Sequence, residues 1–240
     1  MVQRTTKRQV NRLPPERRIS DIMTAAREVF TEKGYAESLI SDIAERAGVV
    51  EGTIYRFFAN KRELLQRVAE DWFVEMMASD DEAFGSVRGE WNQIRFIVHH
   101  HLNSIRRDAA LSRLVFQELR PDPNYRETEL FKLKRAYTQR IVEVVRAGIA
   151  SGAFRPDASP SLVRDMLYGS IEHLTWAYLR NERDFDLDST ADSITDMIYL
   201  GLLHQRPTPP SRDLDTLARL EAVADRLERA TAQTDTAIRS

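Results

Sequence analysis

The sequence contains no cysteine, which excludes disulfides, cysteine-ligated zinc sites and thiol catalysis. It also lacks any apolar run near the ~18 residues that a membrane-spanning helix needs. Residues 1–18 are charged but lack the apolar stretch of a secretory signal. We therefore expect a cytoplasmic protein with no membrane partner.

The period-two alternation of apolar and polar residues that marks a half-buried strand is absent as well. Apolar residues instead recur at intervals of three and four, and 42% hydrophobic with 30% charged residues is ordinary for a protein with a buried core. We predict an all-α fold. Helices are expected over residues 15–33, 40–47, 50–58, 61–78, 91–105, 111–120, 125–151, 160–180 and 189–204, and one more is expected after a Pro-rich linker.

The net charge of −2 conceals an asymmetry along the chain. Residues 1–18 hold six Lys and Arg against one Glu, so this segment attracts polyanions. We read the chain as a basic arm (1–18), a helix-turn-helix domain (19–60), a ligand-binding and dimerisation domain (61–205) and a linker with an extra helix (206–240). A short basic arm can also be merely solubilising.

Residues 40–58 form the most informative stretch, with two short helical patterns separated by Gly48. The spacing suits a helix-turn-helix, with Ser38 as the expected N-cap of the first helix and Asn60 capping the helix that follows the unit. Such a unit holds its second helix out, where its first residues can reach base edges in a major groove. An αα-hairpin with no role beyond structure has the same spacing.

The motifs "AAREVFTEKGY", "DIAERAGV", "GTIYRFF" and "NKRELL" follow one another within residues 19–65. In order and spacing they resemble the DNA-binding domain of the TetR family of bacterial transcriptional regulators. The resemblance implies a three-helix DNA-binding domain, an all-helical ligand-binding domain and a homodimer that usually represses until a small molecule binds. The expected partner is therefore a double-stranded DNA operator.

The resemblance also implies a set of DNA-binding residues. Gly52 and Thr53 match the base-contacting end of the recognition helix, and Tyr55 and Lys61 match phosphate contacts. The full set expected at DNA is Ser38, Ser41, Gly52, Thr53, Tyr55, Arg56 and Lys61. Leu39, Val50, Glu51 and Phe57 depart from the residues that the family often has, so the base preference of other members does not carry over.

The second domain offers two apolar stripes, over residues about 160–180 and 189–204, which we expect to pair with their counterparts in a homodimer. Residues 148–203 are loosely similar to TetR-family fatty-acid regulators that respond to acyl-CoA, which suggests an elongated apolar tunnel. Candidate lining residues are Trp72, Phe73, Met76, Phe96, His100, Phe116, Tyr137 and Trp176, and Arg106, Arg107, Arg113 and Arg120 are candidates for the CoA phosphates.

Several alternatives stay open at this point. The aromatic residues can belong to an ordinary core, and the effector can be a different hydrophobic or aromatic small molecule. A helical scaffold without DNA binding is a further reading. His99, His100 and His101 are adjacent, and residues about 100° apart around a helix cannot converge on one ion. No catalytic motif is recognisable, so we expect no enzyme, no metal and no cofactor.

Overall fold

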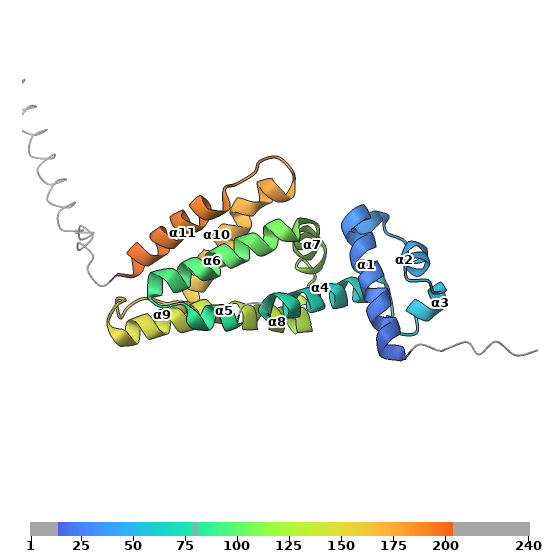
Figure 1. Cartoon of the computed structure of the whole chain (residues 1–240), viewed down its shortest axis with the longest axis horizontal. Coiled ribbons are helices and arrows are strands. Elements are labelled where there is room, and N and C mark those ends of the chain that lie inside the picture. The colour runs from blue at the N-terminus through green and yellow to red at the C-terminus, as the bar shows by residue number, and fades with distance from the viewer. Residues whose placement is uncertain (1–13, 79–80, 204–240) are drawn as a thin grey trace, which may run out of the picture. The chain divides into compact units, whose positions relative to one another are not determined.

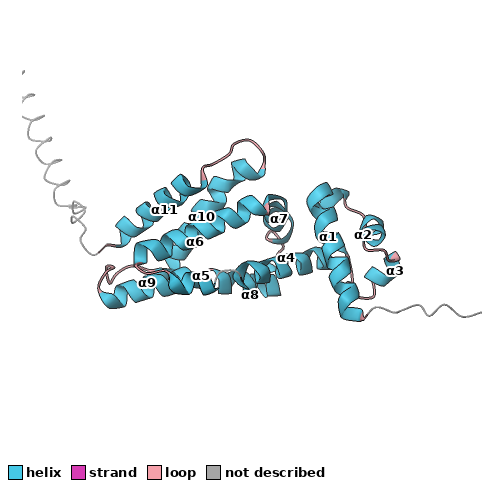
Figure 2. Cartoon of the chain, viewed as in Figure 1, coloured by secondary structure: helices cyan, strands magenta, loops and turns pink. Residues whose placement is uncertain are grey.

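The computed structural model describes residues 14–78 and 81–203. Within these ranges every regular element is a helix, and β pairing occurs only as an isolated bridge between Phe154 and Leu203 (Figures 1 and 2). The prediction of an all-α fold is confirmed. None of the described helices is both long enough and apolar enough to cross a membrane.

Four helices make up the first part of the chain: α1 (Pro15–Glu37), α2 (Ile40–Arg46), α3 (Glu51–Ile54) and α4 (Lys61–Ala78). The regular part of α1 breaks at Gly34, whose φ of 76° a glycine adopts without strain, so the expected helix end is confirmed there. Helix α3, the expected recognition helix, is shorter than the predicted span of 50–58, because the chain turns after Ile54.

The remaining elements are α5 (Asp81–Ser86), α6 (Glu90–Arg107), α7 (Ala109–Leu114), a π-helix η1 (Val115–Leu119), a 3-10 turn η2 (Tyr125–Glu127), α8 (Glu129–Tyr137), α9 (Gln139–Ser151), α10 (Pro160–Leu179) and α11 (Leu187–Leu202). Two predictions were wrong in detail. The helix predicted over 125–151 consists of a 3-10 turn, α8 and α9, with a break at Thr138, and residues 81–86, which lie outside every predicted helix, are helical.

Two hydrophobic clusters hold these helices together. The first cluster contains side chains of α1, α2, α3, α4, α7, η1 and α8, and the second contains side chains of α6, α9, α10 and α11. The first cluster crosses the expected domain boundary at residue 60, since Phe58 and Leu64 both belong to it. Helices α1, α2 and α3, which we call the recognition unit, are thus packed on the same core as the start of the expected second domain. The exact division into domains stays a prediction.

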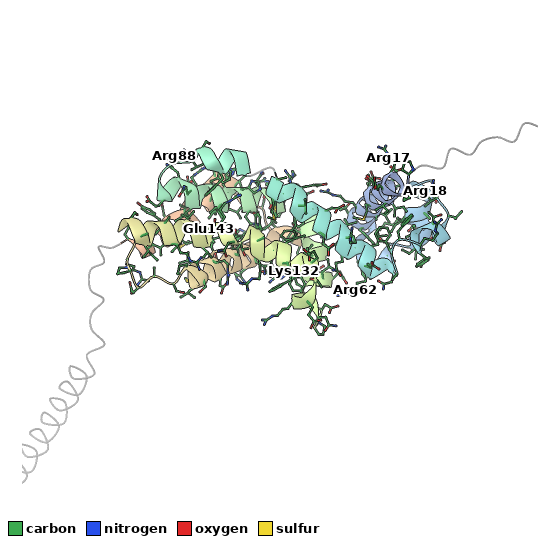
Figure 3. The ribbon with its side chains drawn as sticks, turned by 90° about the horizontal axis from the view of Figure 1, so that it is seen from below. Arg17, Arg18, Arg62, Arg88, Lys132 and Glu143 are labelled. Atoms are coloured by element: carbon green, nitrogen blue, oxygen red, sulfur yellow. The ribbon has the colours of Figure 1, made fainter. Side chains whose placement is uncertain are left out.

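Two of the expected segments lie largely or wholly outside the described residues. These are residues 1–13 of the basic arm and the linker and helix of residues 206–240. Arg17 and Arg18, the described end of the arm, lie at the start of α1 (Figure 3). Arg17 pairs with Asp21 at 3.3 Å, and both side chains are open to solvent.

Candidate DNA-binding surface and effector cavity

The first turn of α2 shows why the predicted N-cap was wrong. The side chain of Ser38 is fully buried, and its hydroxyl donates to the carbonyl oxygens of Gly34 and Val29 at 2.5 and 3.3 Å. Leu39 occupies the N-cap position instead, and its backbone N–H donates to the carboxylate of Asp42 at 3.1 Å. Ser38 therefore secures the end of α1 and is not on the surface, whereas Ser41 is exposed.

The short helix α3 is held from one side only. Ile54 and Phe58 are almost completely buried, at 1% and 4% exposure. Gly52 of α3 is exposed and Thr53 partly exposed, and Tyr55 and Arg56, which directly follow α3, are exposed as well. A Cβ added at Gly52 would meet no atom within 4 Å, so packing inside the protein does not require a glycine there.

Lys61, the last of the predicted DNA contacts, is engaged within the protein. Its ammonium donates to the carbonyl oxygens of Tyr35 and Ser38 at 2.7 and 2.9 Å, and it lies 4.4 Å from the centre of the Tyr35 ring. Lys61 thus satisfies carbonyl groups at the end of α1, which would otherwise lack donors. At the same corner, Asn60 accepts from the N–H of Glu63 at 2.9 Å, as its predicted capping role requires.

Helix α4 connects the recognition unit to the rest of the chain through a polar junction. Arg27 of α1 donates to Glu75 of α4 at 2.8 Å and to Asp108 at 3.1 Å, and Trp72 also donates to Asp108 at 3.1 Å. Burial by itself raises the pKa of Asp108, but hydrogen bonds from Arg107, Arg27 and Trp72 outweigh it and lower the pKa below its usual value. Asp108 therefore stays ionised and fastens α1 to the junction of α6 and α7.

A second junction lies at the start of α4. Arg62 donates to the carbonyl oxygen of Glu118 and pairs with Asp122, both at 2.8 Å (Figure 3). Glu118 belongs to the π-helix η1, and Arg120, which directly follows η1, lines a cavity. A displacement of η1 would therefore also displace Arg62 in the first turn of α4, next to the recognition unit.

That cavity has a volume of about 420 Å³, which is within the range of small-molecule sites. Its walls come from α4, α6, η1, η2, α8 and α10 and combine aromatic rings with charged groups. They are Phe73, His101, Val115, Phe116, Arg120, Tyr125, Arg126, Phe131, Lys134, Arg135, Tyr137, Thr138, Arg164, Asp165, Tyr168, Gly169 and Glu172.

The structure brings together only part of the predicted lining. Phe73, Phe116 and Tyr137 border this cavity, and Phe96 and His100 border a much smaller one of about 10 Å³ that shares Tyr137 and Tyr168 with it. The three others border neither cavity. Trp72 is buried against Phe73 and Asp108, Met76 lies in the first hydrophobic cluster, and Trp176 packs on Phe116.

Among the four candidate arginines, only Arg120 lines the cavity. Arg106 pairs with Asp184 at 3.2 Å, and Arg107 with Asp108 at 3.1 Å. Arg113 donates to the carbonyl oxygen of Leu179 at 3.0 Å. These three residues hold helix ends and loops in place.

The cavity is electropositive. Five of its lining side chains are cationic and only Asp165 and Glu172 are acidic. Glu172 is paired with Arg120, and Asp165 with Arg164. Burial lowers the pKa of Lys134, and the nearby charge of Arg120 acts in the same direction. Such a site favours a ligand that brings negative charge to its rim.

The interior of the cavity is polar at one point. Nδ1 of His101 lies 3.2 Å from the hydroxyl of Tyr137, and the His101 ring meets that of Tyr168 edge-on at 4.9 Å. Burial lowers the pKa of His101 to about 3, with repulsion from His100 and Lys134 adding to it, so the imidazole is neutral. Its neighbour His99 turns instead toward Asp188, at 3.6 Å.

The two stripes expected at the dimer interface are each divided between core and surface. Leu167 and Ile171 of α10 are fully buried within the chain, whereas Leu162, Met166 and Leu174 remain exposed. On α11, Ile194 and Leu202 are buried, whereas Met197 and Leu200 are exposed at 70% and 61%. The exposed members leave an apolar surface on both helices.

Comparison with known proteins gives matches for the helix-turn-helix and for the helices that follow it in the chain. Residues 22–68 match the family described as bacterial regulatory proteins, tetR family, and residues 69–201 match the C-terminal region of YsiA-like proteins. The chain belongs to the TetR family of transcriptional regulators. Members of this family bind DNA operators and dimerise.

Several relatives match this chain over most of their own length. The fatty acid metabolism regulator protein of Bacillus subtilis is 26% identical over 184 residues, which are 75% of this chain and 93% of that protein. The B. subtilis regulator YhgD is 33% identical over 75% of this chain and 94% of its own. The transcriptional activator FasR of Mycolicibacterium smegmatis is 24% identical over 82% of this chain and 88% of its own length.

Among solved structures, FadR from B. subtilis in complex with stearoyl-CoA superposes with a TM-score of 0.68 and 25% identity. The match covers 76% of this chain and 98% of FadR. The expected likeness to fatty-acid regulators is therefore confirmed at the level of sequence and fold.

Sequence reasoning missed several residues that line the cavity, among them Lys134, Arg164 and Tyr168. Arg164 and Tyr168 lie on α10, the helix that was assigned to the dimer interface. Lys134 and Arg135 are charged residues on an amphipathic helix, a pattern typical of a solvated face. Nothing in the local sequence distinguishes a cation beside a cavity from one in bulk solvent.

Proposed function

We propose that the chain is a dimeric regulator that binds its operator through α2 and α3 and is released by a ligand with an apolar body and an anionic head. The observation that carries the ligand proposal is the cavity of about 420 Å³, with aromatic walls and a surplus of cationic side chains. A long-chain acyl-CoA has both parts. The resemblance to FadR, whose structure contains stearoyl-CoA, supports this class of ligand.

The DNA-binding part rests on the one-sided packing of α3. Ile54 is buried whereas Gly52, Tyr55 and Arg56 are exposed, and a Cβ added at Gly52 would meet no atom within 4 Å. We propose that Gly52 allows the backbone of α3 to approach the duplex, that Ser41, Tyr55 and Arg56 contact phosphates, and that Thr53 contacts a base edge. A phosphate contact of Lys61 would compete with its bonds to the carbonyl oxygens of Tyr35 and Ser38 and with a longer one, of 3.5 Å, to that of Ala36.

For the dimer, we propose that the exposed residues of α10 and α11 pair with those of a second copy in a four-helix bundle. Leu162, Met166, Leu174, Met197 and Leu200 supply the apolar surface. Two-fold pairing sets the distance between two recognition helices, which must match about 34 Å for adjacent major grooves. Release then requires the ligand to prefer a dimer arrangement with a different spacing.

The experiment measures operator binding by fluorescence anisotropy, with a duplex selected by this protein from a random-sequence pool. Stearoyl-CoA is compared with stearate and with CoA alone. Stearoyl-CoA is expected to release the duplex and raise the melting temperature, while the two fragments act weakly because each fills only half of the site. Release by an uncharged aromatic compound and not by stearoyl-CoA would favour the alternative of a different hydrophobic effector.

A charge reversal tests the role of the rim. Arg135→Glu, at the cavity, is expected to weaken the response to stearoyl-CoA by about fivefold, corresponding to about 1 kcal/mol. The matched control is Lys132→Glu on the same helix (Figure 3). Lys132 does not line the cavity and pairs with Glu129 at 3.0 Å. Equal effects of the two variants would contradict a specific anionic-head site.

A further inference from the structure

Two exposed apolar residues at the recognition unit have no explanation in the fold. Leu39 and Val50 occupy the N-cap positions of α2 and α3, and these residues are 59% and 73% exposed. Ser, Thr, Asp and Asn are strongly preferred at N-caps because their oxygen accepts a backbone N–H. Neither leucine nor valine does so, and neither gains much from burial.

Val50 lies where the recognition helix begins. Its backbone is extended, with φ −88° and ψ 150°, and its carbonyl oxygen accepts the N–H of Thr53 at 2.8 Å. Its side chain therefore projects from the first turn of α3, the part of a recognition helix that reaches base edges. A valine that weakens the cap and stays exposed is better explained by a contact outside the chain than by stability.

The major groove limits what this contact can be. Base edges there present hydrogen-bond donors, acceptors and a single kind of apolar group, the 5-methyl of thymine. Since valine has neither donor nor acceptor, a hydrogen bond to a base is impossible. From the position and chemistry of the side chain, we infer that Val50 is a specificity-determining residue that packs on a thymine methyl group in each half-site.

Leu39 provides a matched comparison. It is also exposed and apolar at an N-cap, but it belongs to α2, the helix that crosses the backbone in this motif. We expect Leu39 to pack against the sugar-phosphate backbone and to be indifferent to the base. This inference rests on the proposed binding of DNA through α3.

The test replaces single thymines of a selected duplex by deoxyuridine, which removes only the methyl group. For the wild-type protein, one position in each half-site is expected to lose about fourfold in affinity, the factor that matches about 0.8 kcal/mol for one buried methylene-sized group. Val50→Ser should bind thymine and deoxyuridine equally at that position. Leu39→Ser should retain the discrimination and change affinity alike for both duplexes.

The melting temperature distinguishes base recognition by Val50 from a structural role of this residue. Val50→Ser supplies the missing cap, so its melting temperature should rise while its discrimination of the methyl group disappears. The inference is overturned if deoxyuridine is tolerated at every position by the wild-type protein, or if Val50→Ser keeps the full discrimination. Failure to select any duplex would instead contradict DNA binding itself, so the two outcomes are distinguishable.

Discussion

The recognition unit and the cavity region are packed in different ways. Around α1 to α3, Ile22, Val29, Phe30 and Ile43 are completely buried, and Lys61 satisfies the carbonyl groups at the end of α1. Around the cavity, α7 continues as the π-helix η1, the helix predicted over 125–151 is interrupted, and His101 and Lys134 are partly buried with lowered pKa values.

This difference fits the separate tasks of the two regions. A DNA-reading surface must keep its side chains in a fixed arrangement, whereas a ligand site must change when it is filled. A π-helix is an irregularity that is frequent at functional sites. Arg62 connects η1 to the first turn of α4, and Arg27 connects α1 to Asp108, so both regions are tied by a few specific bonds.

The same truncation in the two regions gives the sharpest test. Phe30→Ala removes a fully buried ring from the recognition core and is expected to cost about 3–5 kcal/mol. Phe116→Ala removes a partly buried ring that borders the cavity, so the loss of stability should be clearly smaller. Urea denaturation of both variants measures this. Equal losses would show that the cavity wall is packed as tightly as the recognition core.

Lys61→Met tests whether this residue stabilises the fold or mainly contacts DNA. Loss of charge-assisted bonds to two carbonyl oxygens should lower the free energy of unfolding by about 1.5 kcal/mol. Arg67→Met, on the exposed side of the same helix, serves as the control. If Lys61→Met keeps the wild-type stability but weakens DNA binding, the residue acts at phosphates and its carbonyl bonds are incidental.

Acidification should affect the cavity region through His101. The unfolded chain takes up a proton near pH 6.5, whereas the folded chain stays neutral there down to about pH 3. Stability contributed by this group is therefore present above pH 6.5 and is lost as the pH falls toward 3. Between pH 7 and 5.5 the expected loss is about 1.2 kcal/mol.

This loss is measured as the difference between the wild-type protein and His101→Gln, which can still bond to Tyr137 but does not titrate. Parallel pH profiles for the two proteins would mean that His101 is accessible enough to charge in the folded state. DNA affinity should change less than stability over this range, because His101 lies in the cavity region and not at α3.

Tyr55→Ala should have the smallest effect. Tyr55 is 52% exposed, so the free energy of unfolding should hardly change. One lost phosphate contact is expected to reduce the slope of log affinity against log salt by about 0.9, equally for all operators. Titrations at several salt concentrations check this, with the exposed Val74→Ala as a control outside the recognition unit. A change in base preference would instead assign Tyr55 to base readout.

Sequence was a good guide to the recognition unit because its determinants are local. The break at Gly34, the bounds of α4 and the cap at Asn60 depend on residues within a few positions of one another. The error at Ser38 arose because its hydroxyl is taken by Gly34 and Val29, which lie four and nine positions earlier and compete with the cap.

The cavity was harder to predict because one helix presents several faces to different neighbours. Trp72 and Phe73 are adjacent aromatic residues, yet only Phe73 borders the cavity, while Trp72 donates a hydrogen bond to Asp108. Likewise, α10 has buried, exposed and cavity-lining positions along a single apolar pattern. Periodicity shows that a helix is amphipathic but not which partner covers each face.

By itself, therefore, the sequence determined the all-α fold, the helix-turn-helix and the family, since helical periodicity, caps and closely spaced motifs are encoded within short stretches. Only the tertiary structure decided which cations surround a cavity, which residues join α1 to the effector region and which apolar side chains remain exposed. Those properties arise from contacts between residues far apart in the chain, such as Arg27 with Asp108 and Arg120 with Glu172.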